Sequence, residues 1–153
     1  STINGQMNAG WTIERQEINA ADGATGAPGD ITIYKDGAIF KAIEVTERPI
    51  DGSRVDSTFS TKITLNNAAE YLFVYTNDLP RENALERAKA YFAQGYNINF
   101  ASITDLTIHI LLSGDEAFRT AYNERMFELF NAQDVQATIK VAWNDALTEA
   151  MQA

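Results

Sequence analysis

The stretch "APGDITIYKDGAIFKAIEVTERPID", Ala27 to Asp51, contains the pattern from which we predict the fold. Two runs rich in β-branched and aromatic residues, Asp30–Tyr34 and Ala38–Glu47, are separated by a Lys-Asp-Gly segment. Runs of this kind joined by a short, glycine-containing segment are typical of a β-hairpin. We therefore expect two antiparallel strands that meet at a tight turn.

The register of this hairpin decides whether Asp30 and Glu44 lie on one face. A two-residue turn pairs Asp30 with Ile43, which puts the two acids on opposite faces. A three-residue loop that ends with Gly37 in the left-handed conformation, forming a bulge, pairs Asp30 with Ala42 instead. Glu44 then lies diagonally along the same face, within reach of a shared ion. We expect this three-residue, bulged form.

The remaining sequence predicts an α/β protein with a mixed sheet flanked by helices, because strand and helix patterns alternate after the hairpin. Upstream, Trp11–Asn19 fits a strand or a short helix. Downstream we expect, in order, a helix over Ser53–Asn67 capped by Asp51 or Ser53, a strand over Glu70–Asn77, a helix from Asn77 to Gln94, a strand over Ile98–Asp105, and two or three helices from Asp105 to Ala150, broken near Ser113-Gly114 and Asn131. We expect residues 1–18 to form an N-terminal arm and residues 19–153 to form one domain, since the chain is long enough for one core.

Composition narrows the class of protein. The 153 residues include no cysteine and one histidine, which excludes disulfides, thiolate metal sites and multi-histidine zinc sites within the chain. No apolar run is long enough for a membrane span and the N-terminal residues lack a signal-peptide pattern, so we expect a cytoplasmic protein without a membrane partner. The formal net charge of −9 argues against a DNA partner, although net charge does not fix the sign of a local cleft.

Asp30 and Glu44 are candidate metal ligands. Two carboxylates on neighbouring strands can hold Mg²⁺, which binds oxygen atoms and usually keeps several waters and substrate phosphate oxygens. Such an ion polarises a phosphoryl oxygen and orients the attacking water. Glu44 has apolar neighbours on both sides, and an acid buried there needs a partner. The alternative is that Asp30 only ends a loop and Glu44 faces solvent, because acid pairs are common on surfaces.

The same residues resemble the signature of the PD-(D/E)XK nucleases. Pro28-Gly29-Asp30 and Ala42–Thr46 carry the short motif, with the hairpin between them. Over most of the chain from about Asn19 onward, the order of segments is similar to that of SacI-like type II restriction endonucleases: "AADGATGAPGDI", "AIEVTERPI", "EYLFVYTN", "GYNINFASITDL" and "KVAWNDAL".

This resemblance implies a restriction-endonuclease-like nuclease domain over residues 19–153 that hydrolyses double-stranded DNA with Mg²⁺. Asp30 and Glu44 correspond to the two metal-binding acids, and the backbone carbonyl of Val45 corresponds to a further ligand. Thr46 departs from the family, because it stands where the pattern has a lysine that orients water and neutralises charge. A threonine hydroxyl can form hydrogen bonds but carries no positive charge.

Three explanations of Thr46 are open. The enzyme works with an uncharged residue at this position, or a lysine from elsewhere replaces the missing one, or the site no longer cuts. Lys62 on the following helix is our first choice for a replacement; Lys41 ranks lower because it alternates onto the face opposite Glu44. A site that no longer cuts would make the chain a degenerate nuclease fold used for DNA binding or protein interaction. A structural domain with no role in DNA metabolism is a further alternative.

Contacts with DNA would also need residues outside the motif. Arg48 and Arg54 follow it directly and are the best-placed basic residues for a DNA backbone. Recognition of a specific DNA sequence would need either a preceding N-terminal region or a second protomer. We expect that such a region could be missing here, because the sequence begins at Ser1 rather than at methionine. A homodimer suits two-fold DNA sites because both share one symmetry.

Overall fold

The computed structural model describes residues 11–15, 27–131 and 135–152, and the chain divides into two compact units, Ser1–Ile108 and His109–Ala153. The predicted arm falls largely on residues outside the described ones. The predicted boundary between residues 18 and 19 lies there too, so that division of the chain stays a prediction.

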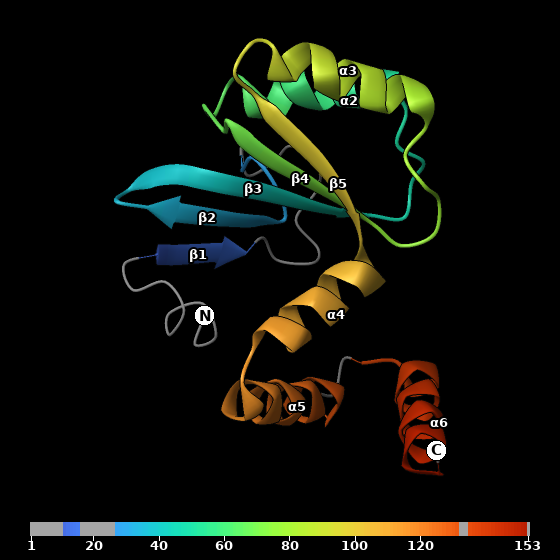
Figure 1. The fold of residues 1–153 in the computed structure, drawn as a ribbon. Helices are drawn as coiled ribbons and strands as arrows, with labels where there is room; N and C mark the ends of the chain where they lie inside the picture. Colours follow the sequence, from blue (N-terminus) through green and yellow to red (C-terminus); the bar gives the residue numbers. More distant parts are fainter. Residues whose placement is uncertain (1–10, 16–26, 132–134, 153) are drawn as a thin grey trace. The chain divides into compact units, whose positions relative to one another are not determined.

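The first unit contains a five-stranded mixed sheet (Figure 1). The strands are β1 (Trp11–Arg15), β2 (Ile31–Lys35), β3 (Ala38–Thr46), β4 (Glu70–Tyr75) and β5 (Asn97–Ser102), and they lie side by side in chain order. The pairs β1–β2 and β2–β3 are antiparallel, whereas the pairs β3–β4 and β4–β5 are parallel. The predicted α/β class with a mixed sheet is confirmed. The first five residues of the segment predicted as a strand or a short helix form the strand β1, and the rest of that segment lies outside the described residues.

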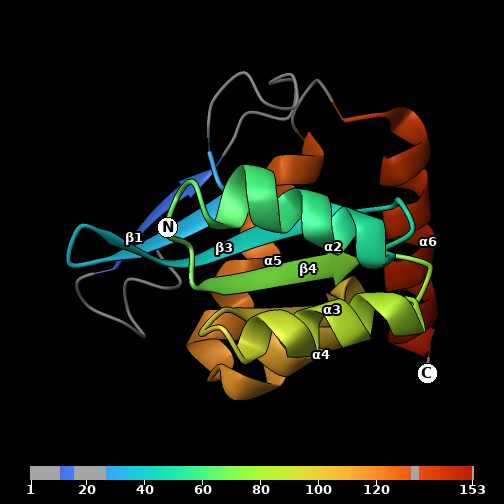
Figure 2. The same cartoon turned by 90° about the horizontal axis from the view of Figure 1, so that it is seen from above.

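Helices cover one face of this sheet (Figures 1 and 2), because each parallel connection needs a crossover. Helix α2 (Gly52–Thr58) leads directly into a π-helix, η1 (Phe59–Ile63), and α3 (Glu82–Phe92) makes the next crossover. Asp51 caps α2 as one of the two predicted caps, since its side chain accepts a hydrogen bond of 3.0 Å from the Arg54 N–H.

The core lies between these helices and the sheet. Tyr71 and Phe73 of β4 are fully buried, and they belong to one cluster of buried residues with Val55 of α2 and Ile63 of η1. Alternation along β3 brings Ala42 into the same cluster, so the even-numbered residues at the end of β3 face the helices. This face is the one on which the candidate site lies.

The second unit is helical. Helix α4 (Ile103–Ser113) runs across the boundary between the units, and α5 (Glu116–Asn131) and α6 (Ala137–Gln152) follow it. The predicted breaks near Ser113-Gly114 and Asn131 are confirmed. Within the described residues, no helix combines the length and the apolar character that crossing a membrane requires.

The hairpin of β2 and β3 forms as predicted, but its turn differs from the prediction. Asp36-Gly37 is a two-residue turn with positive φ at both positions, 52° and 79°, which is the type I′ geometry. Lys35 pairs directly with Ala38 across it. The predicted three-residue loop is therefore wrong, and so is the pairing of Asp30 with Ala42.

A bulge further along β3 changes the register instead. The extra residue is Phe40, because its two neighbours in β3 pair with consecutive residues of β2. Beyond the bulge Ile31 lies opposite Ile43. Asp30, which comes directly before β2, is therefore level with Glu44. The bulge brings the acids together as expected, but it does so from within the strand and not from the turn.

Candidate active site

A cleft of about 560 Å³ lies where β3 ends, between the start of β2 and the helical segment of α2 and η1. Strand ends of this kind are the usual position of sites in α/β sheets. The cleft is lined by every residue that the sequence singled out as a site residue: Asp30, Glu44, Val45, Thr46, Arg48, Arg54 and Lys62. Lys41, the lower-ranked alternative to Lys62, is not among the lining residues.

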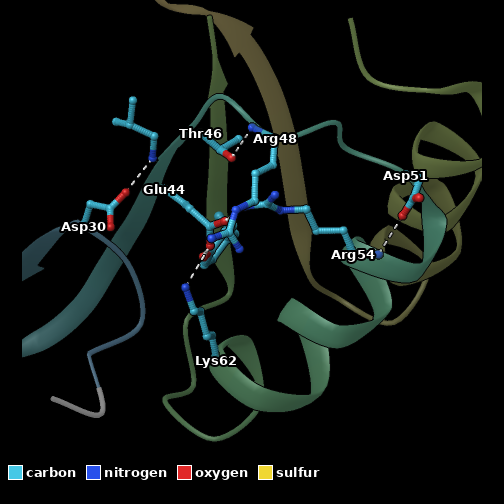
Figure 3. A network of polar contacts seen from close by, with 9 residues as sticks. Asp30, Glu44, Thr46, Arg48, Asp51, Arg54 and Lys62 are labelled. Carbon is cyan, nitrogen blue, oxygen red and sulfur yellow. Dashed lines mark hydrogen bonds and ion pairs between the residues drawn. The ribbon is translucent and has the colours of Figure 1, made fainter. Parts of the chain in front are cut away.

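Asp30 is held by the backbone of the neighbouring strand. The Val45 N–H donates a hydrogen bond of 2.7 Å to its Oδ2 atom (Figure 3). This bond lies just beyond Ile31–Ile43, the last residue pair between β2 and β3. In an antiparallel ladder the N–H and C=O of one residue point to the same neighbour, so the Val45 carbonyl leaves β3 on the side of Asp30. Gly29 makes this approach possible, because a Cβ atom there would lie 2.6 Å from the Ile43 carbonyl oxygen.

Glu44 is held by side chains. Its own side chain is 8% exposed, and its carboxylate accepts hydrogen bonds from Arg54 Nη2 at 2.6 Å, Lys62 Nζ at 2.9 Å and the Tyr71 hydroxyl at 2.8 Å. Figure 3 shows Arg54 and Lys62 reaching it from the helical segment. Burial alone would raise the pKa of Glu44, but the hydrogen bonds from Arg54, Lys62 and Tyr71 outweigh it and lower the pKa below its ordinary value. Glu44 is therefore a stable carboxylate.

Tyr71 is a residue of this site that the sequence did not reveal, because it stands in an apolar run that predicts only a buried strand. Burial, followed by the negative charge of Glu44, raises the pKa of its hydroxyl far above the ordinary range. The hydroxyl therefore stays protonated and donates to Glu44. Parallel pairing places Tyr71 beside Ala42, two residues before Glu44. The sequence held one signal for this contact, a tyrosine hydroxyl in a strand expected to be buried beside the strand that carries Glu44.

Thr46 does not replace the cation that the family pattern has at this position. Its buried hydroxyl oxygen accepts a hydrogen bond of 3.1 Å from the Arg48 N–H, so it organises the turn after β3. The positive charge near Glu44 comes from Lys62 and Arg54 instead. The structure thus brings Lys62 to the acid, while its catalytic role stays a prediction. Arg54, predicted to contact DNA, binds Glu44 here.

The charges that line the cleft are balanced, unlike those of the whole chain. Three acids and three bases line it: Asp30, Glu44, Glu47, Arg48, Arg54 and Lys62. The net charge of −9 resides elsewhere on the molecule. The cleft therefore lacks the excess negative charge that would repel a phosphate group.

The donor atoms at the cleft fit a hard divalent cation. Two carboxylates, from Asp30 and Glu44, and one strand carbonyl, from Val45, are oxygen donors of the kind that Mg²⁺ prefers. Among the residues that the structure describes, no three or more His, Cys, Asp or Glu side chains form a cage for a metal. Water and substrate oxygens would therefore complete the coordination, as is usual for Mg²⁺.

Comparison with protein families places these residues in a known context. The family model of the SacI restriction endonuclease C-terminal domain matches residues 1–77, half of the chain. The matched part contains β1 to β4, α2, η1 and all the residues that line the cleft. Comparison with curated proteins gives no match.

Proposed function

The chain belongs to the SacI restriction endonuclease C-terminal domain family, and from this we propose that it is a Mg²⁺-dependent endonuclease that hydrolyses phosphodiester bonds in double-stranded DNA. The observation that carries the proposal is the meeting of two acids, Asp30 and Glu44, with two cations, Arg54 and Lys62, in one cleft of the matched region. Enzymes of phosphoryl transfer work mainly by positioning and by electrostatic stabilisation. These side chains are suited to both tasks.

Five of the residues that line the cleft have a task in the proposed reaction. Asp30, Glu44 and the carbonyl of Val45 would hold the ion, which supplies Lewis-acid activation of the phosphoryl oxygen and of the attacking water. Lys62 would provide the positive charge that Thr46 lacks and stabilise the charge that develops on the phosphoryl group. Arg48, which also lines the cleft, would bind an adjacent phosphate of the DNA backbone.

Plasmid cleavage with Mg²⁺ or Mn²⁺ tests the proposal. We expect the wild type to nick or linearise the plasmid, and we expect Glu44→Ala and Asp30→Ala to lose at least about 100-fold in rate. Glu86→Ala is the matched control, because it removes an exposed acid from α3, away from the cleft. Equal cutting by the wild type and Glu44→Ala would show that the activity is a contaminant and would contradict the proposal.

A second candidate function is DNA binding without cleavage. It is favoured by the hydrogen bonds that already occupy both oxygens of Glu44 and by the missing charge at Thr46. This reading predicts that the protein binds a DNA duplex equally in EDTA and in Mg²⁺ and leaves plasmid intact. The endonuclease proposal predicts tighter binding with the ion, and cutting.

Recognition of a particular DNA sequence stays a prediction, as do the homodimer, the preceding N-terminal region and the cytoplasmic location. Light scattering of the protein with and without a DNA duplex measures whether the homodimer forms. A mass that doubles on the duplex supports a dimeric enzyme, and a constant protomer mass contradicts it.

A further inference from the structure

Glu44 is engaged on both carboxylate oxygens. Arg54 occupies Oε1, and Lys62 and Tyr71 occupy Oε2. A metal ligand needs a free lone pair directed at the ion and little positive charge beside it. The contacts of Glu44 therefore conflict with its proposed task unless at least one cation leaves.

The charges around the two acids sharpen this conflict. Arg54 and Lys62 already balance Asp30 and Glu44, since all four side chains line one cleft. A divalent ion added to this balanced set leaves an excess of two positive charges, and like charges in a partly buried site repel strongly. A phosphate group is the ligand whose negative charge relieves that excess and whose oxygens suit guanidinium and ammonium donors.

We propose that Glu44 exchanges partners: Arg54 and Lys62 hold it when no divalent ion is bound, and the ion releases them to bind the substrate phosphate. Ion and phosphate then bind with positive coupling, and each raises the affinity of the other by the same factor. The inference rests on the proposed function, because it takes a DNA phosphate as the occupant of the cleft.

The structure has the parts that such an exchange needs. The side chains of Arg54 and Lys62 are 22% and 31% exposed, whereas that of Glu44 is 8% exposed. The two cations can therefore turn into the cleft by side-chain rotation, while Glu44 stays within β3. Tyr71 is fully buried and neutral, so it keeps its hydrogen bond and holds the carboxylate in place.

Calorimetric titration with Ca²⁺, which also binds oxygen ligands, measures the first consequence in the absence of DNA. Arg54→Gln and Lys62→Gln each remove a competitor for Glu44, so we expect the two variants to bind Ca²⁺ about 3- to 10-fold more tightly than the wild type. Arg48→Gln is the matched control, since it removes the same charge from the same cleft without touching Glu44. Weaker binding by the two variants, or an equal gain in all three, overturns the proposal.

Fluorescence anisotropy of a short labelled DNA duplex, in EDTA and in Ca²⁺, measures the second consequence. Direct contact between ion and phosphate would couple their binding in every variant. Partner exchange adds to this coupling in the wild type. We expect Ca²⁺ to raise the affinity of the wild type for the duplex by a factor within the usual 5- to 150-fold range. The gain should shrink several-fold in Arg54→Gln and Lys62→Gln. An equal gain in the wild type and both variants overturns the exchange.

The two proposals fail in different ways. Partner exchange stands and the endonuclease proposal falls if the plasmid stays intact while the variants bind Ca²⁺ more tightly. The exchange alone falls if the wild type cuts but neither variant gains affinity, and it also falls if no form of the protein binds Ca²⁺. Arg54→Gln and Lys62→Gln each remove one partner of Glu44, so either variant alone decides the question if the other proves to be unfolded in its melting curve.

Discussion

Asp30 and Glu44 line the same cleft but are held by different parts of the molecule. Asp30 lies at the start of β2 and is bound by one backbone N–H, from Val45. Glu44 lies within β3 and is bound by three side chains, from α2, η1 and β4. An acid held by the backbone is fixed by the pairing of the strands, whereas an acid held by side chains depends on which residues occupy three other elements and can change its partners.

The largest expected difference between the two acids is in stability. Glu44→Ala leaves the buried hydroxyl of Tyr71 unpaired and separates two cations from their anion, although both can turn toward water. We expect a loss of about 3 kcal/mol in the free energy of unfolding. Asp30→Ala, just before β2 begins, loses one hydrogen bond from the Val45 N–H and should cost about 1 kcal/mol. Urea denaturation measures both, and equal losses would contradict the comparison.

Gly29→Ala tests whether the fold fixes Asp30. The new Cβ atom would lie 2.6 Å from the Ile43 carbonyl oxygen, so the backbone next to Asp30 must move. We expect a loss of about 2 kcal/mol together with weaker Ca²⁺ binding.

Gly95→Ala is the control for this substitution. Gly95 has a positive φ, of 92°, which strains an alanine there, but no atom lies within 4 Å of the added Cβ. It should lose about 1 kcal/mol and keep its affinity for Ca²⁺. Unchanged Ca²⁺ binding by Gly29→Ala would show that the approach of Gly29 to Ile43 does not position Asp30.

Tyr71→Phe tests the side-chain support of Glu44 at its most buried point. It removes one hydrogen bond to a carboxylate that keeps two cationic donors, so we expect a loss of about 1.5 kcal/mol in thermal or urea unfolding. Tyr91→Phe is the matched control, because the Tyr91 hydroxyl donates to Asp56 at 2.8 Å but lies nearer to solvent. A loss at Tyr71 no greater than that at Tyr91 would mean that burial adds nothing to this contact.

The smallest expected effect is on the pH dependence of stability. The pKa of Glu44 is lower in the folded protein than its ordinary value of 4.5, so the unfolded chain binds more protons in this range. The stabilising contribution of Glu44 is complete above pH 4.5 and is lost as the pH falls through the lower, folded pKa. In Glu44→Gln the free energy of unfolding, measured by urea denaturation at several pH values, should fall less steeply below pH 4.5 than in the wild type. The same slope in both proteins would show that Glu44 does not contribute to it.

Local sequence chemistry was enough to predict most of the fold. β-Branched runs predicted the strands of the sheet, Asp51 and Ser53 were the two predicted caps at the start of α2, and the Lys-Asp-Gly segment predicted the hairpin. The register was not predictable, because the bulge at Phe40 has no sequence signal such as a glycine. In the sequence Phe40 is an ordinary strand residue, and only the pairing of the two complete strands shows that it forms a bulge.

The site was predictable to the extent that its residues follow one another in the motif. Asp30, Glu44, Val45 and Thr46 could be located from the hairpin, and Lys62 from the helix after it. The contacts of Arg54 and Tyr71 with Glu44 were not predictable, since they depend on how α2 and β4 pack against β3. The sequence had suggested another role for each residue, contact with the DNA backbone for Arg54 and core packing for Tyr71.

The π-helix η1 has a consequence for how the helix can vary in length. Arg54 and Lys62 are eight residues apart, and in a regular α-helix this spacing would turn them about 80° from each other. The wider turn of η1, closed by the hydrogen bond from Thr64 N–H to the Phe59 carbonyl, accommodates one extra residue between them. The extra residue returns Lys62 to the side of Arg54. Deleting one residue between them would leave a regular α-helix with a spacing of seven residues, which keeps Lys62 within about 20° of Arg54, whereas straightening the helix with all eight residues retained would direct the ammonium group away from the carboxylate that it now contacts.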